Sequence, residues 1–224
     1  MKNLKLFVIA FLTTAHAFAA DNVKTDPVGD IDNSITACPD VGTDMVETSF
    51  SREGENFVAT MKMSKNIDNT FGYKEYYFWI DVNQTDKKGH PVGYQPYDPE
   101  SVAWPNMYAD YRIFLSLDAN NESHRAYPSV RMQDCAASDC SKDGGLRYED
   151  NIKVDIKGNE VIFTWPKSLV PAIESAASLK VGYTTYYEIG GACHGEDDSP
   201  QWGRNAYVIA KPKSPAPAPA PKPQ

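Results

Sequence analysis

The sequence predicts an all-β protein, an antiparallel β-sandwich of about eight to nine strands with an immunoglobulin-like or jelly-roll-like pair of sheets and long loops. Segments of alternating or aromatic-rich sequence recur along the chain, short glycine-containing turns join several of them, and almost no segment has the periodicity of a helix. The expected strands are residues 44–50, 57–63, 76–83, 108–117, 152–156, 160–165, 179–188 and 205–210.

The strongest strand signal is the run YYFWIDVNQ, from Tyr76 to Gln84. Its aromatic and β-branched residues are typical of a strand that is covered on both faces, so we expect it at the centre of a sheet. The run ends in Asp81 and Asn83. Oxygen-bearing side chains at the exit of a strand can position a metal or a ligand, or they can simply form a solvated turn.

The intervening segments are polar and rich in Gly, Pro, Asn or Asp, and we expect them to be loops. Two hairpins are expected, with turns at Gly54 and Gly158, and one helical turn is expected at residues 173–177. The expected loops are residues 21–42, 84–107, 118–150 and 190–202.

The two ends of the chain are expected to lie outside the sandwich. Residues 1–19 have the pattern of a secretory signal peptide: Lys2 and Lys5 precede an apolar run, and small residues allow cleavage after Ala19. We therefore expect a bacterial protein that is secreted or periplasmic. The sandwich would span residues 20–210, and no later stretch is apolar enough to cross a membrane. Residues 211–224 alternate Pro and Ala and are expected to form a disordered tail, either a spacer or a tether to the envelope.

The charge of the exported chain is strongly negative. Removing Lys2 and Lys5 from the 22 basic residues leaves 20 against 30 acidic ones, a net charge of −10. An acidic domain without a stripe of Lys and Arg is not suited to nucleic acids or to anionic lipids. It is suited to binding cations.

Cysteine usage also indicates an oxidising compartment. The four cysteines form an even set without a CxxC pair, which favours two disulfides over a zinc site. Three pairings are possible. We expect Cys135–Cys140, which would close a short loop, and Cys38–Cys193, which would tie the start of the domain to its end.

Short motifs spread over most of the exported chain resemble, in the same order, those of the carbohydrate-binding-module-9-like, or DOMON-like, family of secreted bacterial β-sandwiches. The chain departs from the family in its cysteines, its long loops, and Asn83 where a second Asp is more usual. The resemblance implies a β-sandwich that binds sugars, sometimes haem, and often a structural calcium near its opening segment. The motifs are DPVGD at 26–30, PDVGTDM at 39–45, FWIDVN at 78–83 followed by Gly89, ADYRI at 109–113, FTWPKSL at 163–169 and EDDSP at 196–200.

The candidate calcium ligands are carboxylates in and near the opening segment. Calcium binds about six to eight oxygens, so a site needs several carboxylates together with backbone carbonyls. The alternative is that these aspartates cap turns. Asp197 and Asp198 would join the site only if their segment folds beside the opening one. The expected ligands are Asp26, Asp30, Asp44 and Asp110.

The candidate glycan-binding residues are aromatic side chains in polar or turn-rich surroundings. An aromatic face packs against the apolar face of a sugar, although packing within the loop is the alternative role. Trp79 and Trp165 lie within strands and are expected in the core. The candidates are Tyr94, Tyr97, Trp104, Tyr108 and Trp202.

Haem and catalysis have weaker sequence support. Met107 and His124 are conceivable haem ligands, but the chain lacks a c-type attachment motif, and we expect no haem. No hydrolase motif is present, and the abundant acidic residues select no catalytic pair.

We therefore expect a non-catalytic binding module for a glycan or another cell-envelope component. The alternatives are a small hydrolase that uses loop carboxylates and a structural envelope protein tethered by its tail.

Overall fold

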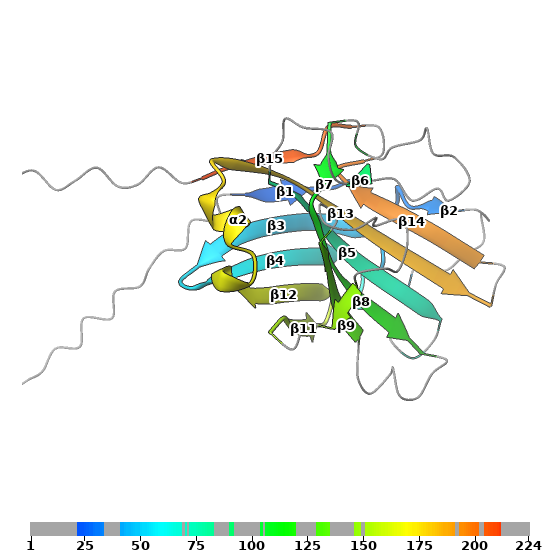
Figure 1. The fold of residues 1–224 in the computed structure, drawn as a ribbon. Helices are drawn as coiled ribbons and strands as arrows, with labels where there is room; N and C mark the ends of the chain where they lie inside the picture. Colours follow the sequence, from blue (N-terminus) through cyan, green and yellow to red (C-terminus); the bar gives the residue numbers. More distant parts are fainter. Residues whose placement is uncertain are drawn as a thin grey trace, which may run out of the picture.

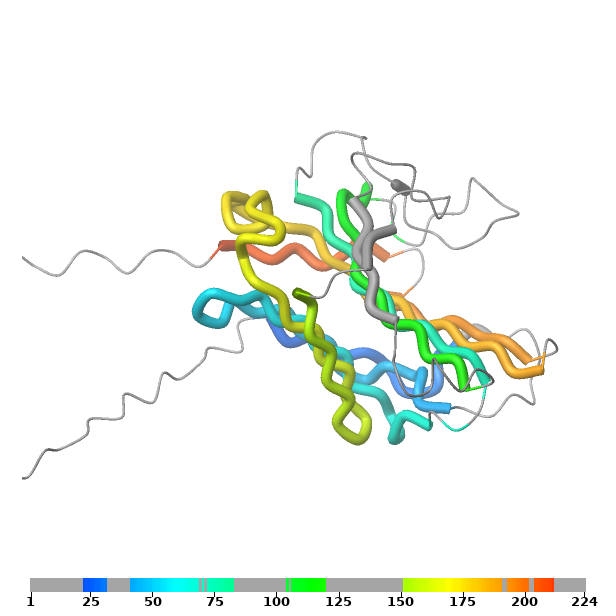
Figure 2. Tube along the Cα trace, turned by 60° about the horizontal axis from the view of Figure 1, so that its bottom comes forward, coloured from blue at the N-terminus to red at the C-terminus, as the bar shows by residue number. Residues whose placement is uncertain are grey.

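Two antiparallel sheets form a β-sandwich, which confirms the expected fold class (Figure 1). The sheets lie as two layers with the core between them (Figure 2). The structure is a computed structural model. Among its described residues, no helix is long and apolar enough to cross a membrane. It describes residues 22–33, 41–68, 70, 72–82, 90–91, 104, 106–119, 129–134, 146–148, 151–190, 193–201 and 204–211.

The smaller sheet has five strands in the order β1-β3-β4-β12-β11. Both predicted hairpins are confirmed, with turns at Gly54 and Gly158. These glycines have φ values of 56° and 64°, in the left-handed region that glycine adopts without steric cost. The strands are β1 (Val23–Thr25), β3 (Met45–Glu53), β4 (Asn56–Met63), β12 (Glu160–Pro166) and β11 (Lys153–Lys157).

The larger sheet has eight strands, seven of them in the order β10-β9-β8-β5-β13-β14-β2. The eighth, β15, shares an edge of β13 with β14. β5 lies between β8 and β13, and most of its residues are buried, as the sequence predicted for this run. The strands are β10 (Leu146–Tyr148), β9 (Ser129–Asp134), β8 (Tyr111–Asp118), β5 (Tyr73–Asp81), β13 (Ser178–Ile189), β14 (Cys193–Ser199), β2 (Asp32–Asn33) and β15 (Tyr207–Ala210).

The prediction that residues 190–202 form a loop is wrong, because β14 pairs with β13 along its whole length. Acidic residues disfavour strands, but backbone pairing with a long neighbour overrides that preference. Other short strands also lie in segments expected to be loops: β1 and β2, β9 and β10, and β6 (His90–Pro91), which pairs with β7 (Tyr108–Ala109). The expected helical turn is found slightly earlier, as α2 (Pro171–Ser175), directly after the 3-10 turn η1 (Lys167–Leu169).

The main core lies between the sheets and is rich in aromatic rings. Phe78 of β5 packs on Phe50 of β3, with ring centroids 5.5 Å apart, and on Tyr183 of β13, at 5.0 Å. Trp165 is fully buried beside these rings, as predicted. Aromatic residues from both sheets therefore interlock at the centre of the sandwich.

A second hydrophobic cluster covers the outer face of the large sheet. Alternation along β5 sends Tyr77 and Trp79 to this face, where they pack with Phe114 of β8. Trp104 also belongs to this cluster, is fully buried, and donates from Nε1 to the Pro200 carbonyl at 2.7 Å. The prediction that Trp104 offers a ring face to a ligand is therefore wrong. The sequence indicates that Trp104 lies in a loop, but its packing against the sheet is evident only in the folded structure.

Gly182 provides a test of this packing, because a Cβ added there would lie 2.3 Å from carbons of the Trp104 ring. We expect Gly182→Ala to lower the free energy of unfolding by about 1–3 kcal/mol, the usual range for overpacking, as measured by urea unfolding. The same substitution in a Trp104→Leu background should have a much smaller effect, because the shorter side chain leaves room. Equal losses in both backgrounds would contradict the buried placement of Trp104.

Candidate metal centre

Four aspartates gather where the opening segment and the start of β3 meet β14. Asp30, Asp44 and Asp197 each offer a carboxylate oxygen, and these oxygens lie within 4.8 Å of one another. Asp26 adjoins them, because its carboxyl group interacts electrostatically with both Asp30 and Asp44. We refer to Asp26, Asp30, Asp44 and Asp197 as the aspartate group. It combines residues from both ends of the domain.

The opening segment is folded onto the start of the small sheet by backbone contacts. The Asp26 N–H donates to the Val46 carbonyl at 2.9 Å. The Gly29 N–H donates to Asp44 Oδ1 at 2.9 Å, and Gly29 has a φ of 84°, which favours glycine at this turn. The sequence Asp-Pro-Val-Gly-Asp thus curls against Asp44, and its last residue, Asp30, places a carboxylate oxygen within 4.8 Å of one of Asp44.

The large sheet contributes Asp197, a buried residue of β14. Asp197 Oδ2 accepts the Met45 N–H at 2.6 Å, a contact that joins β14 to β3 across the two sheets. Gln201, just beyond β14, donates from Nε2 to Asp30 Oδ2 at 2.6 Å. The carboxylates are therefore held in place by bonds to three separate segments.

The next residue of β14, Asp198, points to the outer face of the sheet. Its Oδ1 accepts the Thr184 hydroxyl at 2.8 Å, and Thr184 Oγ1 accepts Trp79 Nε1–H at 3.1 Å. The carboxyl group of Asp198 also acts electrostatically on Asp26. A chain of two hydrogen bonds thus leads from the neighbourhood of the aspartate group to the outer aromatic cluster.

The aspartate group contains more negative charge than the surrounding protein compensates. Burial, and then the neighbouring carboxylates, raise the pKa of Asp26 to about 7 and that of Asp197 to about 9. Burial likewise raises the pKa of Asp198 to about 7. Within the described part of the chain, no hydrogen-bond donor reaches Asp26 Oδ2 or Asp30 Oδ1, although both oxygens are buried. Buried carboxylate oxygens that lack donors and repel one another suit a hard cation.

Three of the four predicted calcium ligands lie together in this group, and one does not. Asp26, Asp30 and Asp44 are brought together, and Asp197 joins them because its segment does fold beside the opening one. Asp110 instead lies at the exit of β5, where its Oδ2 accepts the Val82 N–H at 2.8 Å. Among the described residues, Asp110 is not part of the group, so its prediction as a shared ligand is wrong.

The remaining predicted site residues are placed only in part. Tyr108 is half-buried at the start of β7, and Met107 is buried in the outer cluster. Cys193 is disulfide-bonded, but its partner lies outside the described residues, so the pairing stays a prediction. The others, Tyr94, Tyr97, Trp202, His124, Cys38, Cys135 and Cys140, all lie outside the described residues.

Comparison with known proteins does not identify the chain. No protein-family model matches it, and a search of curated proteins finds no significant match.

The raised pKa values predict a pH dependence of stability in the presence of a chelator. The folded state binds protons to Asp26, Asp197 and Asp198 more tightly than the unfolded state does. Their contribution to stability is therefore complete below the ordinary pKa of 3.8 and is lost as the pH rises through about 7 and about 9. Urea unfolding in EDTA should show lower stability at about pH 8.5 than at about pH 5.5. A chelated protein that gains stability over this range would contradict the arrangement.

Proposed function

We propose that this protein is an exported, non-catalytic binding module, stabilised by one calcium ion, whose ligand is a glycan or another component of the cell envelope. The aspartate group is the observation that carries the proposal. Its four carboxylates come from the opening segment, from the start of β3 and from β14, so an ion there would bridge the two sheets. The secretory pattern of residues 1–19 supports export to a compartment that contains calcium.

Calcium is the cation that best suits these ligands. The group offers only oxygen donors, without the His or Cys side chains that zinc prefers. Magnesium requires a small octahedral shell and usually keeps most of its water, whereas calcium accepts many carboxylates in flexible geometry. Unpartnered oxygens of Asp26 and Asp30 are available to the ion, and water could complete the shell.

The choice of a glycan ligand rests on the resemblance of the chain to the carbohydrate-binding-module-9-like family. The matching motifs include DPVGD in the opening segment, which supplies Asp26 and Asp30, and EDDSP at 196–200, which supplies Asp197. The two-sheet antiparallel architecture is compatible with that family. Sugar binding and calcium binding would then occur in one module, as the resemblance implies.

Calcium should stabilise the folded chain, because an ion that binds only the folded state raises its free energy of unfolding. At a calcium concentration about 100 times the Kd, the gain is about 2.7 kcal/mol relative to chelator. Asp197→Asn should abolish most of this gain. It should also make the chelated protein more stable than wild type at about pH 8, because Asp197, with a pKa of about 9, must take up a proton on folding at that pH, whereas Asn is already neutral. Thermal melts in calcium and in EDTA measure both effects.

Asp110→Asn is the matched control, because it also neutralises a buried aspartate on the large-sheet side but outside the group. This variant should keep the calcium response of the wild type. An Asp197→Asn protein that still gains the full stability from calcium would overturn the proposed site.

The binding function is tested separately with a glycan array, followed by isothermal titration of each glycan that binds on the array. Saturable binding without turnover would support the proposed module. Hydrolysis of a bound saccharide would instead show a hydrolase. Failure of every envelope glycan to bind would refute a glycan ligand and favour a structural role in the envelope.

A further inference from the structure

Six polar and aromatic side chains form two rows on the outer face of the large sheet. In strand register, Tyr73 lies opposite Glu188, which lies opposite His194; in the next row Glu75, Tyr186 and Glu196 are aligned in the same way. Alternation along β5 places these rows on the same face as the outer aromatic cluster. We refer to the set as the tyrosine–glutamate patch: Tyr73, Glu75, Tyr186, Glu188, His194 and Glu196.

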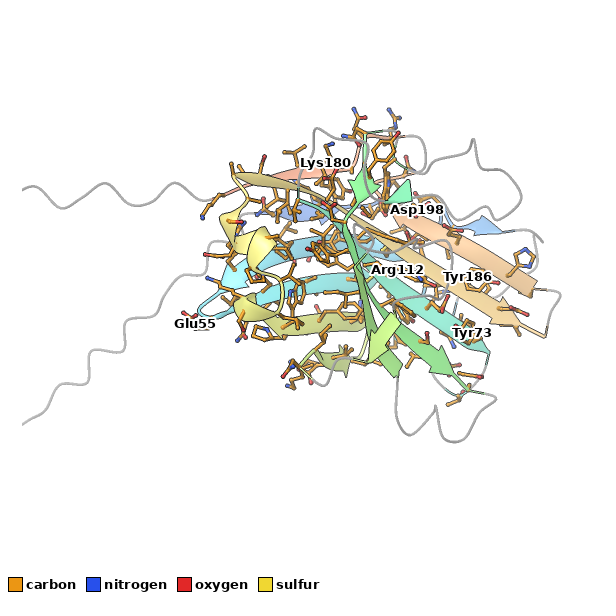
Figure 3. The ribbon with its side chains drawn as sticks, viewed as in Figure 1. Glu55, Tyr73, Arg112, Lys180, Tyr186 and Asp198 are labelled. Carbon is orange, nitrogen blue, oxygen red and sulfur yellow. The ribbon has the colours of Figure 1, made fainter. Side chains whose placement is uncertain are left out.

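This patch is more accessible than the rings beside it. Glu188 and His194 are exposed, and the other four side chains of the patch are half-buried. The neighbouring rings of Tyr77 and Trp79 are only 8% and 6% exposed. Figure 3 shows Tyr73 and Tyr186 on adjacent strands toward the same end of the sheet. A ligand could therefore reach the patch, whereas the inner rings provide its support.

Hydrogen bonds to one carboxylate fix the two tyrosines of β5 that face outward, Tyr73 and Tyr77. Glu75 accepts the hydroxyl groups of both Tyr73 and Tyr77, and Ser116 of β8 donates to it at 3.2 Å. The Tyr77 ring is in turn stacked on that of Phe114, with centroids 5.1 Å apart. The base of the patch is thus rigid before any ligand arrives, which reduces the entropy lost on binding.

The charge of the patch selects among ligands. Its described side chains include the carboxylates of Glu75, Glu188 and Glu196 but no Lys or Arg, and Asp118 of β8 lies opposite Tyr73 as a further acid. An anionic polymer would be repelled here. A ligand with hydroxyl and ammonium groups would find acceptors for both, and charge-assisted bonds to carboxylates are the stronger kind.

We propose that the tyrosine–glutamate patch binds a glycan whose sugars carry free amino groups, such as a chain of glucosamine units. The rings of Tyr73 and Tyr186 would stack on the apolar faces of successive sugars, and the glutamates would accept their ammonium and hydroxyl protons. This inference rests on the proposed glycan-binding function and assigns it a surface and a ligand class.

The test is isothermal titration of the full chain, in calcium at about pH 6, with three oligosaccharides of about six sugars. They are a glucosamine oligomer, its N-acetylated equivalent and an anionic galacturonate oligomer. The glucosamine oligomer should bind the tightest and the galacturonate oligomer the weakest. Tyr186→Ala should weaken binding of the glucosamine oligomer about tenfold. Glu188→Gln should weaken binding of the glucosamine oligomer similarly. It should leave binding of the acetylated oligomer unaffected, because the acetylated sugars carry no ammonium group to bond with the carboxylate.

Two further variants serve as controls. Tyr186→Phe keeps the ring and should bind nearly as wild type does. Glu55→Gln removes an exposed carboxylate from the β3–β4 turn, outside the patch, and should change nothing (Figure 3). Unchanged melting temperatures show that each variant is folded.

Each contrary result has a distinct meaning. A wild-type affinity for the glucosamine oligomer in both Tyr186→Ala and Glu188→Gln would overturn the patch but leave the proposed function standing. Equal affinity for acetylated and free-amine oligomers would overturn the assigned ligand class. If the wild type binds no glycan at all, the proposed function fails and this inference fails with it.

Discussion

Repulsion among buried carboxylates is the constraint on which the junction of the two sheets depends. Oxygens of Asp30, Asp44 and Asp197 lie within 4.8 Å of one another. Two unit charges at that separation repel by roughly 3 kcal/mol at an effective dielectric constant of about 20. Because Asp44 precedes β3 and Asp197 lies on β14, the repulsion acts across the two sheets whenever Asp197 is ionised. Protons or a cation can relieve it, and a cation would convert the repulsion into a bridge.

Strand β14 connects the features of functional interest. Alternation along it sends Asp197 inward to the aspartate group and Asp198 outward to Thr184 and the outer aromatic cluster. Two residues earlier, Glu196 lies in the tyrosine–glutamate patch on the same outer face. A displacement of β14 would therefore move residues of both the aspartate group and the tyrosine–glutamate patch, since the strand is a single rigid element.

Local sequence was sufficient to predict the elements whose patterns are self-contained. The aromatic run of β5 and the hairpins at Gly54 and Gly158 needed only neighbouring residues, because burial and turn geometry appear directly in their composition. β14 could not be recognised in this way. Its residues resemble an acidic loop, and its strand state depends on pairing with β13, a long-range contact that no local signal specifies.

The residues of the candidate site also divide into those that local motifs identify and those whose role depends on long-range contacts. Asp26 and Asp30 were found because they lie in the opening motif DPVGD, and Asp44 because it lies in the next motif, PDVGTDM. Asp110 also lies in a recognisable motif, ADYRI, but in the fold its carboxylate accepts the backbone N–H of Val82. Trp104 was misjudged because a loop aromatic looks the same in sequence whether it faces water or, as here, packs onto Gly182.

The contact between Met45 and Asp197 joins residues 152 positions apart. Closing so long a segment carries a large entropic penalty, so contacts of this kind tend to form late on the folding pathway. Interactions that are absent from the transition state change the rate of unfolding far more than the rate of folding. An ion bound between these segments would therefore act chiefly as a kinetic lock, lengthening the lifetime of the native state without hastening its formation.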